Sequence, residues 1–271
     1  YKRQVFDYES GWALDMPSHP SVDVRYRDQV FSLYRALWAA GVTVDLIPPQ
    51  ADLSGYRLVV LPSLYAITTE TSSRVDDFVR SGGNVVATYM SGIVDEHLHI
   101  HPGAYPGALR STLGVSVEEF CPLRRDEKVS LDDETVADVW TERIHLDTAT
   151  VLSSYLDGPL SGSPAVTIND RGDGRAWYIG TRLQQQAIDA LVVKILRSLK
   201  IRPPVPMVTA PQGLEAVRRC GDEGSFLFLM HHGTETAHVA AKGYDLFQQK
   251  EVSGRLSLRA GEYAVVQEVM G

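Results

Sequence analysis

The sequence predicts an α/β fold followed by a smaller all-β part. Over the first 90 residues, β-prone runs alternate with segments of helical periodicity, an order that builds a doubly wound or flavodoxin-like parallel sheet with helices on both faces. Residues 58–61 (LVVL) form an unbroken apolar run, as expected of a strand buried on both sides of such a sheet. After a proline-rich segment at residues 201–211 the pattern is that of strands throughout. We expect this last part to form a small β-sandwich.

The first half of the chain carries clear start and stop signals. Gly41 and Gly82 each follow a segment of helical spacing, and glycine commonly ends a helix. Thr68 or Thr69 can cap the second helix, with Glu70 in its first turn. The elements expected here are strands over residues 2–8, 42–47, 58–61 and 84–89, and helices over residues 22–40 and 68–82.

The second half changes character after a short helix that ends at Gly114. Short β-like runs suggest an antiparallel extension at one edge of the sheet, and the turn at residues 171–174 (RGDG) predicts a hairpin. A last helix is expected over residues 185–199. These signals predict an α/β domain over residues 1–202, a proline-rich linker over residues 203–211 and a β domain over residues 212–271.

Composition narrows the class of partner. A formal net charge of -8 and a pI near 5.5 argue against nucleic acid or an anionic membrane as the main partner. No apolar run is long enough to span a bilayer. Cys121 and Cys220 lie far apart, which favours a reducing compartment and a cytoplasmic location. Because the chain enters a strand pattern directly after Tyr1, we expect it to be a fragment of a longer protein.

A nucleophile is the first chemistry to consider. Ser91 follows a predicted parallel strand, where hydrolases and class I glutamine amidotransferases place a nucleophile elbow. Such an elbow needs small residues two positions before and after, whereas Ser91 is flanked by Tyr89 and Ile93. A hydrolase using Ser91 and a small-molecule binding module of flavodoxin type remain alternatives.

Metal and acid/base chemistry have weaker support. The run from Asp95 to His101 alternates acids and histidines, the side chains that bind zinc, but the pattern is more typical of a solvated polar loop. Glu118 and Glu119 are adjacent on a predicted strand, so their side chains point to opposite faces. The sequence therefore offers no self-contained catalytic set, and we expect no metal and no cofactor.

Five ordered blocks resemble a known family. They are FDYESGWAL (residues 6–14), HPSVDVRYRDQV (19–30), LSGYRLVVLPSLY (53–65), SGGNVVATYMSGIVDE (81–96) and YPGALRSTLGVSVEEFCPL (105–123). Together they resemble the β-galactosidases of glycoside hydrolase family 42, and the likeness continues through GRAWYIGTRL (174–183).

The resemblance implies a place in a larger enzyme. Enzymes of that family join a catalytic TIM barrel to an α/β trimerisation domain with an amidotransferase-like fold and then to a small β domain. This chain resembles the second and third parts, so the two catalytic glutamates of a retaining mechanism have no counterpart here. The resemblance therefore implies an assembly module, inactive alone, from an enzyme whose barrel binds and hydrolyses terminal β-D-galactosyl residues.

The implied partner is a second and a third copy of the same chain. In such trimers the α/β domain packs against neighbouring subunits and can wall the active site of another subunit. The candidates for that surface combine aromatic residues with a long loop at the strand ends. They are Trp12, His19, Tyr89, Asp95, Glu96, His97 and Tyr105.

Overall fold

The protein is described by a computed structural model that covers residues 2–204, 207–209, 213–222 and 224–268. Its contacts divide the chain into two compact units, Tyr1–Tyr34 with Val44–Ile188, and Arg35–Thr43 with Asp189–Gly271. Residues 205, 206, 210 and 211 of the expected linker lie outside the described residues. Within the linker segment, Met207–Thr209 forms strand β13. The domain boundaries drawn from the sequence therefore stay a prediction.

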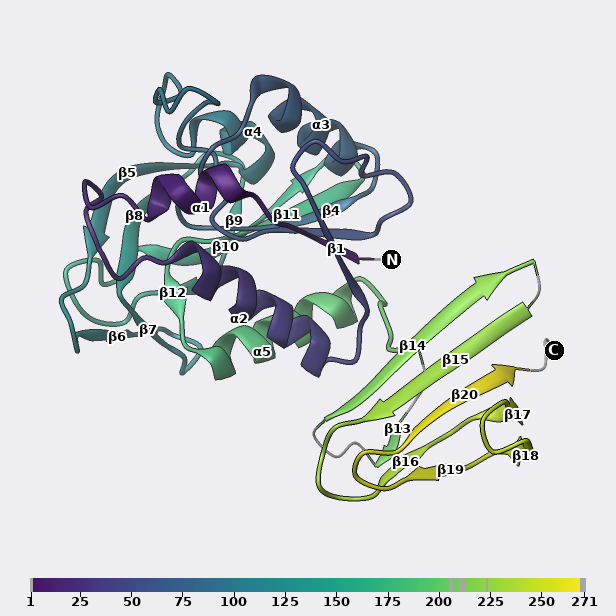
Figure 1. The fold of residues 1–271 in the computed structure, drawn as a ribbon. Coiled ribbons are helices and arrows are strands. Elements are labelled where there is room, and N and C mark those ends of the chain that lie inside the picture. Colours follow the sequence, from purple (N-terminus) through teal and green to yellow (C-terminus); the bar gives the residue numbers. More distant parts are fainter. Residues whose placement is uncertain (1, 205–206, 210–212, 223, 269–271) are drawn as a thin grey trace. The chain divides into compact units, whose positions relative to one another are not determined.

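The first unit is built on a seven-stranded mixed sheet (Figure 1). Its first five strands run parallel, and the last two are antiparallel to their neighbours. The predicted parallel sheet is thus confirmed, and so is the hairpin, which joins β10 to β11. The strands, in spatial order, are β2 (Val44–Ile47), β1 (Lys2–Val5), β3 (Leu58–Leu61), β4 (Asn84–Thr88), β11 (Gly174–Ile179), β10 (Pro164–Arg171) and β9 (Thr150–Ser154).

The short strands of the second half do not all join that sheet. Only β9 extends its edge, whereas the others form two smaller antiparallel sheets. One consists of β5 (Val115–Pro122) and β8 (Trp140–Leu146), and the other of β12 (Arg182–Leu183), β7 (Val136–Asp138) and β6 (Lys128–Ser130). The single edge extension expected from the sequence is therefore divided between β9 and the two smaller sheets. Of these smaller sheets, β8 contacts β10 of the main sheet.

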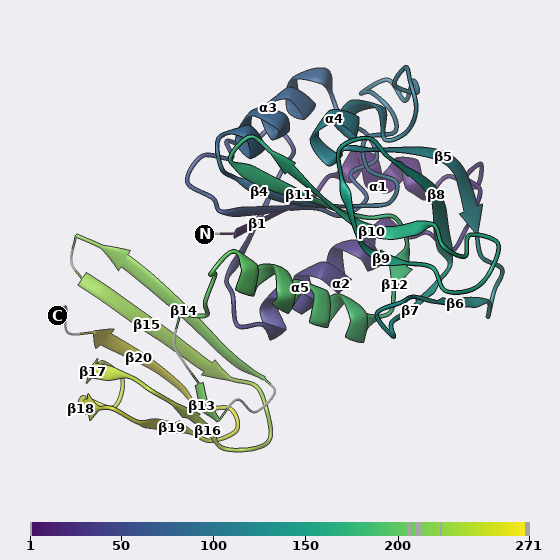
Figure 2. The same cartoon turned by 180° about the vertical axis from the view of Figure 1, so that it is seen from behind.

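Few helices accompany the sheet. Figures 1 and 2 show α3 and α4 on one face and α2 on the opposite face. No helix in the described part of the chain is long and apolar enough to cross a membrane. The helices are α1 (Tyr8–Leu14), α2 (Tyr26–Ala39), α3 (Thr69–Arg80), the 3₁₀ helix η1 (Gly107–Leu109), α4 (Arg110–Leu113) and α5 (Gln185–Ser198).

Helix α1 corrects the sequence prediction, which extended the first strand to residue 8. The carboxylate of Asp7 accepts a hydrogen bond from the backbone N–H of Ser10 at 2.8 Å, so Asp7 caps the N-terminus of α1 and ends the strand run. The backbone N–H of Asp7 in turn donates to the Tyr26 hydroxyl at 2.6 Å. This helix carries Trp12, one of the residues selected from the sequence.

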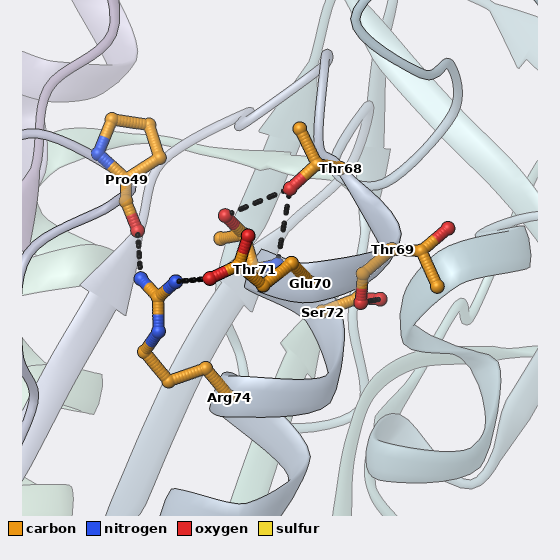
Figure 3. A network of polar contacts seen from close by, with 7 residues as sticks. All are labelled: Pro49, Thr68, Thr69, Glu70, Thr71, Ser72 and Arg74. Atoms are coloured by element: carbon orange, nitrogen blue, oxygen red, sulfur yellow. Dashed lines mark hydrogen bonds and ion pairs between the residues drawn. The ribbon is translucent and has the colours of Figure 1, made fainter.

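Helix α3 begins as predicted. Thr68 is its N-cap, and the Thr68 side chain accepts a hydrogen bond from the Thr71 backbone N–H at 3.1 Å (Figure 3). Arg74 pairs with Glu70 at 3.0 Å and also donates to the Pro49 carbonyl. The apolar face of α3 packs on one face of the sheet in a hydrophobic core that includes Val75, Val79, Val59, Val85 and Ala87.

The C-terminal β part has two antiparallel sheets that share one hydrophobic core. Leu227 and Leu229 of the larger sheet pack with Val239 and Leu258 of the smaller one. The smaller sheet has the order β13, β16 (Ala237–Val239) and β19 (Leu256–Leu258). The larger sheet has the order β14 (Leu214–Gly221), β15 (Gly224–His231), β20 (Tyr263–Glu268), β17 (Lys242–Asp245) and β18 (Lys250–Ser253).

Candidate functional site

The residue at the sharp turn after β4 is Met90, not Ser91. Met90 has φ +62°, the left-handed conformation that the nucleophile of an elbow adopts to leave its strand. The small residues Thr88 and Gly92 stand two positions before and after it, which is the spacing an elbow needs. Placing the elbow at Ser91 from sequence was therefore one residue too late, and the elbow position holds a thioether, which has no hydroxyl or thiol proton that a base could remove.

Ser91 itself has a structural role. Its side chain is fully buried, accepts a hydrogen bond from the Leu64 N–H at 3.1 Å and donates to the Leu61 carbonyl at 3.2 Å. Among the residues that the structure describes, these two backbone groups are its hydrogen-bond partners, and neither is a histidine. The Ser91 hydroxyl therefore joins the end of β4 to the end of β3.

Packed side chains fill the space beside these strand ends. We call this group the strand-end cluster; its buried members are Leu14, Val24, Tyr26, Val30, Tyr89, Met90 and Trp140. Tyr89 stacks on Trp140 with 6.0 Å between ring centroids, and the Tyr89 hydroxyl accepts a hydrogen bond from the Gln29 side chain. In open α/β sheets, ligands bind outside the carboxyl ends of the strands. Here side chains from α1, α2, β8 and the β4 turn occupy that position.

A fully buried carboxylate lies beside the strand-end cluster. Glu142 of β8 accepts hydrogen bonds from Trp140 Nε1 at 2.9 Å and from the Tyr178 hydroxyl at 2.5 Å. Burial raises the pKa of Glu142 to about 7, although these donors and the Met90 backbone N–H favour its ionised form. Glu142 cannot be singled out from the sequence, because its strand shows no acidic pattern and only the fold brings its three hydrogen-bond donors together.

In the loop after β4, the side chain of Asp95 holds the backbone of the following residues. The Asp95 carboxylate accepts hydrogen bonds from the backbone N–H groups of His97 and His99, both at 2.8 Å. These bonds lower the pKa of Asp95. Glu96 and His97 are exposed. In the described part of the chain, no group of three or more histidine, cysteine or acidic side chains is placed to hold a metal ion.

The other selected residues divide between core and surface. Tyr89 is 1% exposed, so the prediction that it lies on an interaction surface is wrong. Its large ring follows β4 directly and packs into the strand-end cluster. Tyr105 is half-buried and stacks on Phe120 at 4.7 Å. His19 donates through Nε2 to the Ala13 carbonyl at 2.6 Å and meets the Tyr65 ring edge-on.

Trp12 lies on an exposed face of α1. Its side chain is 65% exposed, and Tyr8, one turn earlier, is 61% exposed. The two rings contact each other at 6.0 Å. Met16, a further four residues along, is also exposed. We call Tyr8 and Trp12, together with Met16 just beyond the end of α1, the α1 apolar face; the sequence contains the i, i+4 spacing of Tyr8 and Trp12 but did not reveal their helix.

Comparisons with known proteins agree with this arrangement. The family model described as the β-galactosidase trimerisation domain matches residues 4–202. A β-galactosidase from Arthrobacter sp. is 40% identical over 265 residues, which are 97% of this chain and 38% of the relative. The β-galactosidase LacZ of Heyndrickxia coagulans is 38% identical over 88% of this chain and 36% of its own length. This chain thus spans under two fifths of the curated relatives named here.

Solved structures give the same result. A β-galactosidase from Bacillus circulans sp. alkalophilus superposes with a TM-score of 0.92 at 28% identity, over 99% of this chain and 41% of that one. A catalytic mutant of a family 42 β-galactosidase from G. stearothermophilus superposes with a TM-score of 0.91 at 31% identity, over 98% and 40%. The chain belongs to the family of β-galactosidase trimerisation domains.

Proposed function

We propose that this chain is the assembly portion of a β-galactosidase that hydrolyses terminal β-D-galactosyl residues, and that it joins three copies of the enzyme. The observation that carries the proposal is the strand-end cluster. A catalytic α/β sheet keeps this position open for a ligand, whereas here Tyr89, Met90 and Trp140 fill it. Met90 at the elbow supports the same conclusion, because its thioether has no hydroxyl or thiol that a general base could activate.

The fold that we assign to the first unit is flavodoxin-like, of the class I amidotransferase type. Its support is the parallel strand order β2-β1-β3-β4-β11, which is the flavodoxin order 2-1-3-4-5. For the C-terminal part we propose a small β-sandwich, because its two sheets share one core. An amidotransferase-like fold whose elbow holds methionine fits a domain retained for assembly.

We further propose that the α1 apolar face meets a neighbouring subunit in the trimer. Exposed aromatic and methionine side chains are enriched in the centres of protein interfaces. Trp12 and Tyr8 offer such a surface on a rigid helix, and the loop bearing Asp95, Glu96 and His97 is exposed for contact near a neighbour's active site. The catalytic glutamates and the galactoside site belong to the barrel of the intact enzyme in this proposal. We place the enzyme in the cytoplasm, because both cysteines of this chain are free.

A paired assay tests the proposal. The chain is produced in two versions with different affinity tags in the same cells and purified through one tag. We expect the second version to co-purify, and we expect no hydrolysis of a chromogenic β-galactoside by the purified chain. Turnover that survives purification through both tags would overturn the proposal, and so would purification of each version without the other.

A further inference from the structure

The outer face of the larger C-terminal sheet has a cavity lined by aromatic side chains. Strand alternation directs Leu227 and Leu229 of β15 into the core, so Phe228 and Met230 point the other way. Tyr263 of β20 stands directly opposite Met230 in the strand register. These outward side chains line a cavity of about 400 Å³ together with Phe247. Phe228, Phe247 and Tyr263 are 37%, 58% and 55% exposed, an unusual share for aromatic rings on one small sheet.

Phe247 and Tyr263 form a corner of two perpendicular rings. Their centroids lie 4.8 Å apart and their planes meet at 87°. Phe247 lies in the turn between β17 and β18, and the turn is fixed by the buried carboxylate of Asp245, which accepts hydrogen bonds from the N–H groups of Phe247 at 2.9 Å and Gln248 at 3.2 Å. The Leu246 N–H also binds the Val265 carbonyl of β20 at 2.9 Å. The corner is therefore built before any ligand arrives, which lowers the entropic cost of binding.

The polar groups at the rim suit a neutral ligand. Glu262 accepts a hydrogen bond from the Arg259 N–H at 2.7 Å, and His232 lies 3.5 Å from Glu215. Both groups thus already have a protein partner, and the described lining residues include the carboxylate of Glu262 but no lysine or arginine, so the cavity does not suit an anionic ligand. Carboxylate, imidazole and the Tyr263 hydroxyl can still exchange hydrogen bonds with hydroxyl groups of a ligand. Its size falls in the range of small-molecule sites.

We propose that this cavity binds a saccharide ring, with one apolar face of the ring against Phe247 and Tyr263 and its hydroxyls at the rim of His232 and Glu262. A pyranose ring is neutral, carries C–H groups on its faces and hydroxyls around its edge, and so matches each feature of the cavity. The faces of aromatic rings are electron-rich and attract such C–H groups. In a β-galactoside the axial 4-hydroxyl leaves the C–H groups of carbons 3, 4 and 5 on one face. The choice of a galactoside among saccharides rests on the proposed function.

Saturation-transfer NMR on the 271-residue chain with methyl β-D-galactoside tests this site. We expect transfer to the ligand, strongest at hydrogens 3, 4 and 5, and a loss of affinity of about tenfold or more in Phe247→Ala and Tyr263→Ala. Tyr244→Ala is the matched control, because Tyr244 is an exposed aromatic residue of the same sheet that does not line the cavity. Circular dichroism checks that each variant folds.

Three results would overturn the inference. They are no transfer at tens of millimolar galactoside, equal transfer in Phe247→Ala and the parent chain, and binding of an apolar dye that the galactoside does not displace. The molar mass of Phe247→Ala separates this inference from the proposed function. If the variant assembles like the parent chain while the galactoside fails to bind to either, only the saccharide site is lost.

Discussion

Trp140 and Glu142 are joined inside the protein by a hydrogen bond of 2.9 Å from the indole Nε1–H to the carboxylate. The two residues lie two positions apart on β8 and therefore point to the same face of the strand, and the carboxylate also accepts a hydrogen bond from the Tyr178 hydroxyl. A group that is charged in an unfolded chain is thereby held in the core beside the strand-end cluster. This arrangement makes stability depend on pH in a direction opposite to that of an ordinary surface carboxylate.

Replacing Glu142 by glutamine should remove that dependence. Because burial raises the pKa of Glu142 from 4.5 to about 7, the folded protein holds a proton that the unfolded chain releases between these values, and stability falls as pH rises through the interval. The difference corresponds to roughly 3 kcal/mol over the interval from 4.5 to 7. Urea unfolding from pH 4.5 to 8, followed by tryptophan fluorescence, should show this fall in the parent chain relative to Glu142→Gln. Glu119→Gln, at an exposed position, should behave like the parent; parallel profiles for Glu142→Gln and the parent would contradict the account.

Removal of the Tyr89 ring should destabilise the first unit strongly. Tyr89 is fully buried between Trp140 and Gln29, so Tyr89→Ala leaves a cavity in the strand-end cluster and should cost about 3 to 5 kcal/mol of unfolding free energy. Tyr8→Ala removes the same ring from an exposed position and should cost less than about 1 kcal/mol. Urea denaturation of both variants compares them. Equal losses would mean that the cluster does not support the fold as described.

Gly174 should tolerate no side chain. A Cβ there would lie 2.0 Å from the Gly83 carbonyl oxygen and 2.2 Å from that of Val79, and both are backbone atoms that cannot turn aside. We expect Gly174→Ala to cost about 3 kcal/mol or more, since strand β11 must shift away from the end of α3. At Gly221 a Cβ meets no atom within 4 Å, so Gly221→Ala should change stability by less than about 1 kcal/mol. Thermal unfolding distinguishes the two, and a mild effect at Gly174 would count against the register of β4 with β11.

The α1 apolar face should matter for assembly and not for folding. Trp12→Ser removes an exposed ring, so the variant should fold normally but dissociate at a protein concentration about tenfold or more above that of the parent chain. Glu9→Gln changes an exposed polar residue of the same helix and should leave association unchanged. Sedimentation velocity over a dilution series measures the association of both variants. Unchanged association of Trp12→Ser would place the subunit contact elsewhere.

Periodicity predicted most of the fold because it reports which side chains are buried. The parallel sheet, helix α3 with its Thr68 cap and the β10–β11 hairpin all follow from local spacing and turn residues. Helix α1 did not, because the Asp7 cap and the polar residues after it resemble the end of a strand when read without their hydrogen bonds.

The site was harder to predict because its properties arise from distant segments. Whether Ser91 or Met90 stands at the elbow depends on where β4 stops, and one residue reverses the chemical conclusion. The burial of Glu142 depends on Tyr178, which is 36 residues away along the chain. The exposure of the Trp12 side chain depends on helix α1, which the sequence pattern did not predict. The local sequence pattern thus located the ends of the strands, but not the side chains that pack beside them.

The proposed function requires this chain to assemble into trimers. The molar mass of the purified chain, measured by light scattering across a hundredfold range of concentration, tests the assembly directly. One chain has a mass of 29.9 kDa, so the account predicts a rise to a plateau of about 90 kDa. A mass that stays at that of a single chain at every concentration, or a plateau at twice that mass, would contradict it.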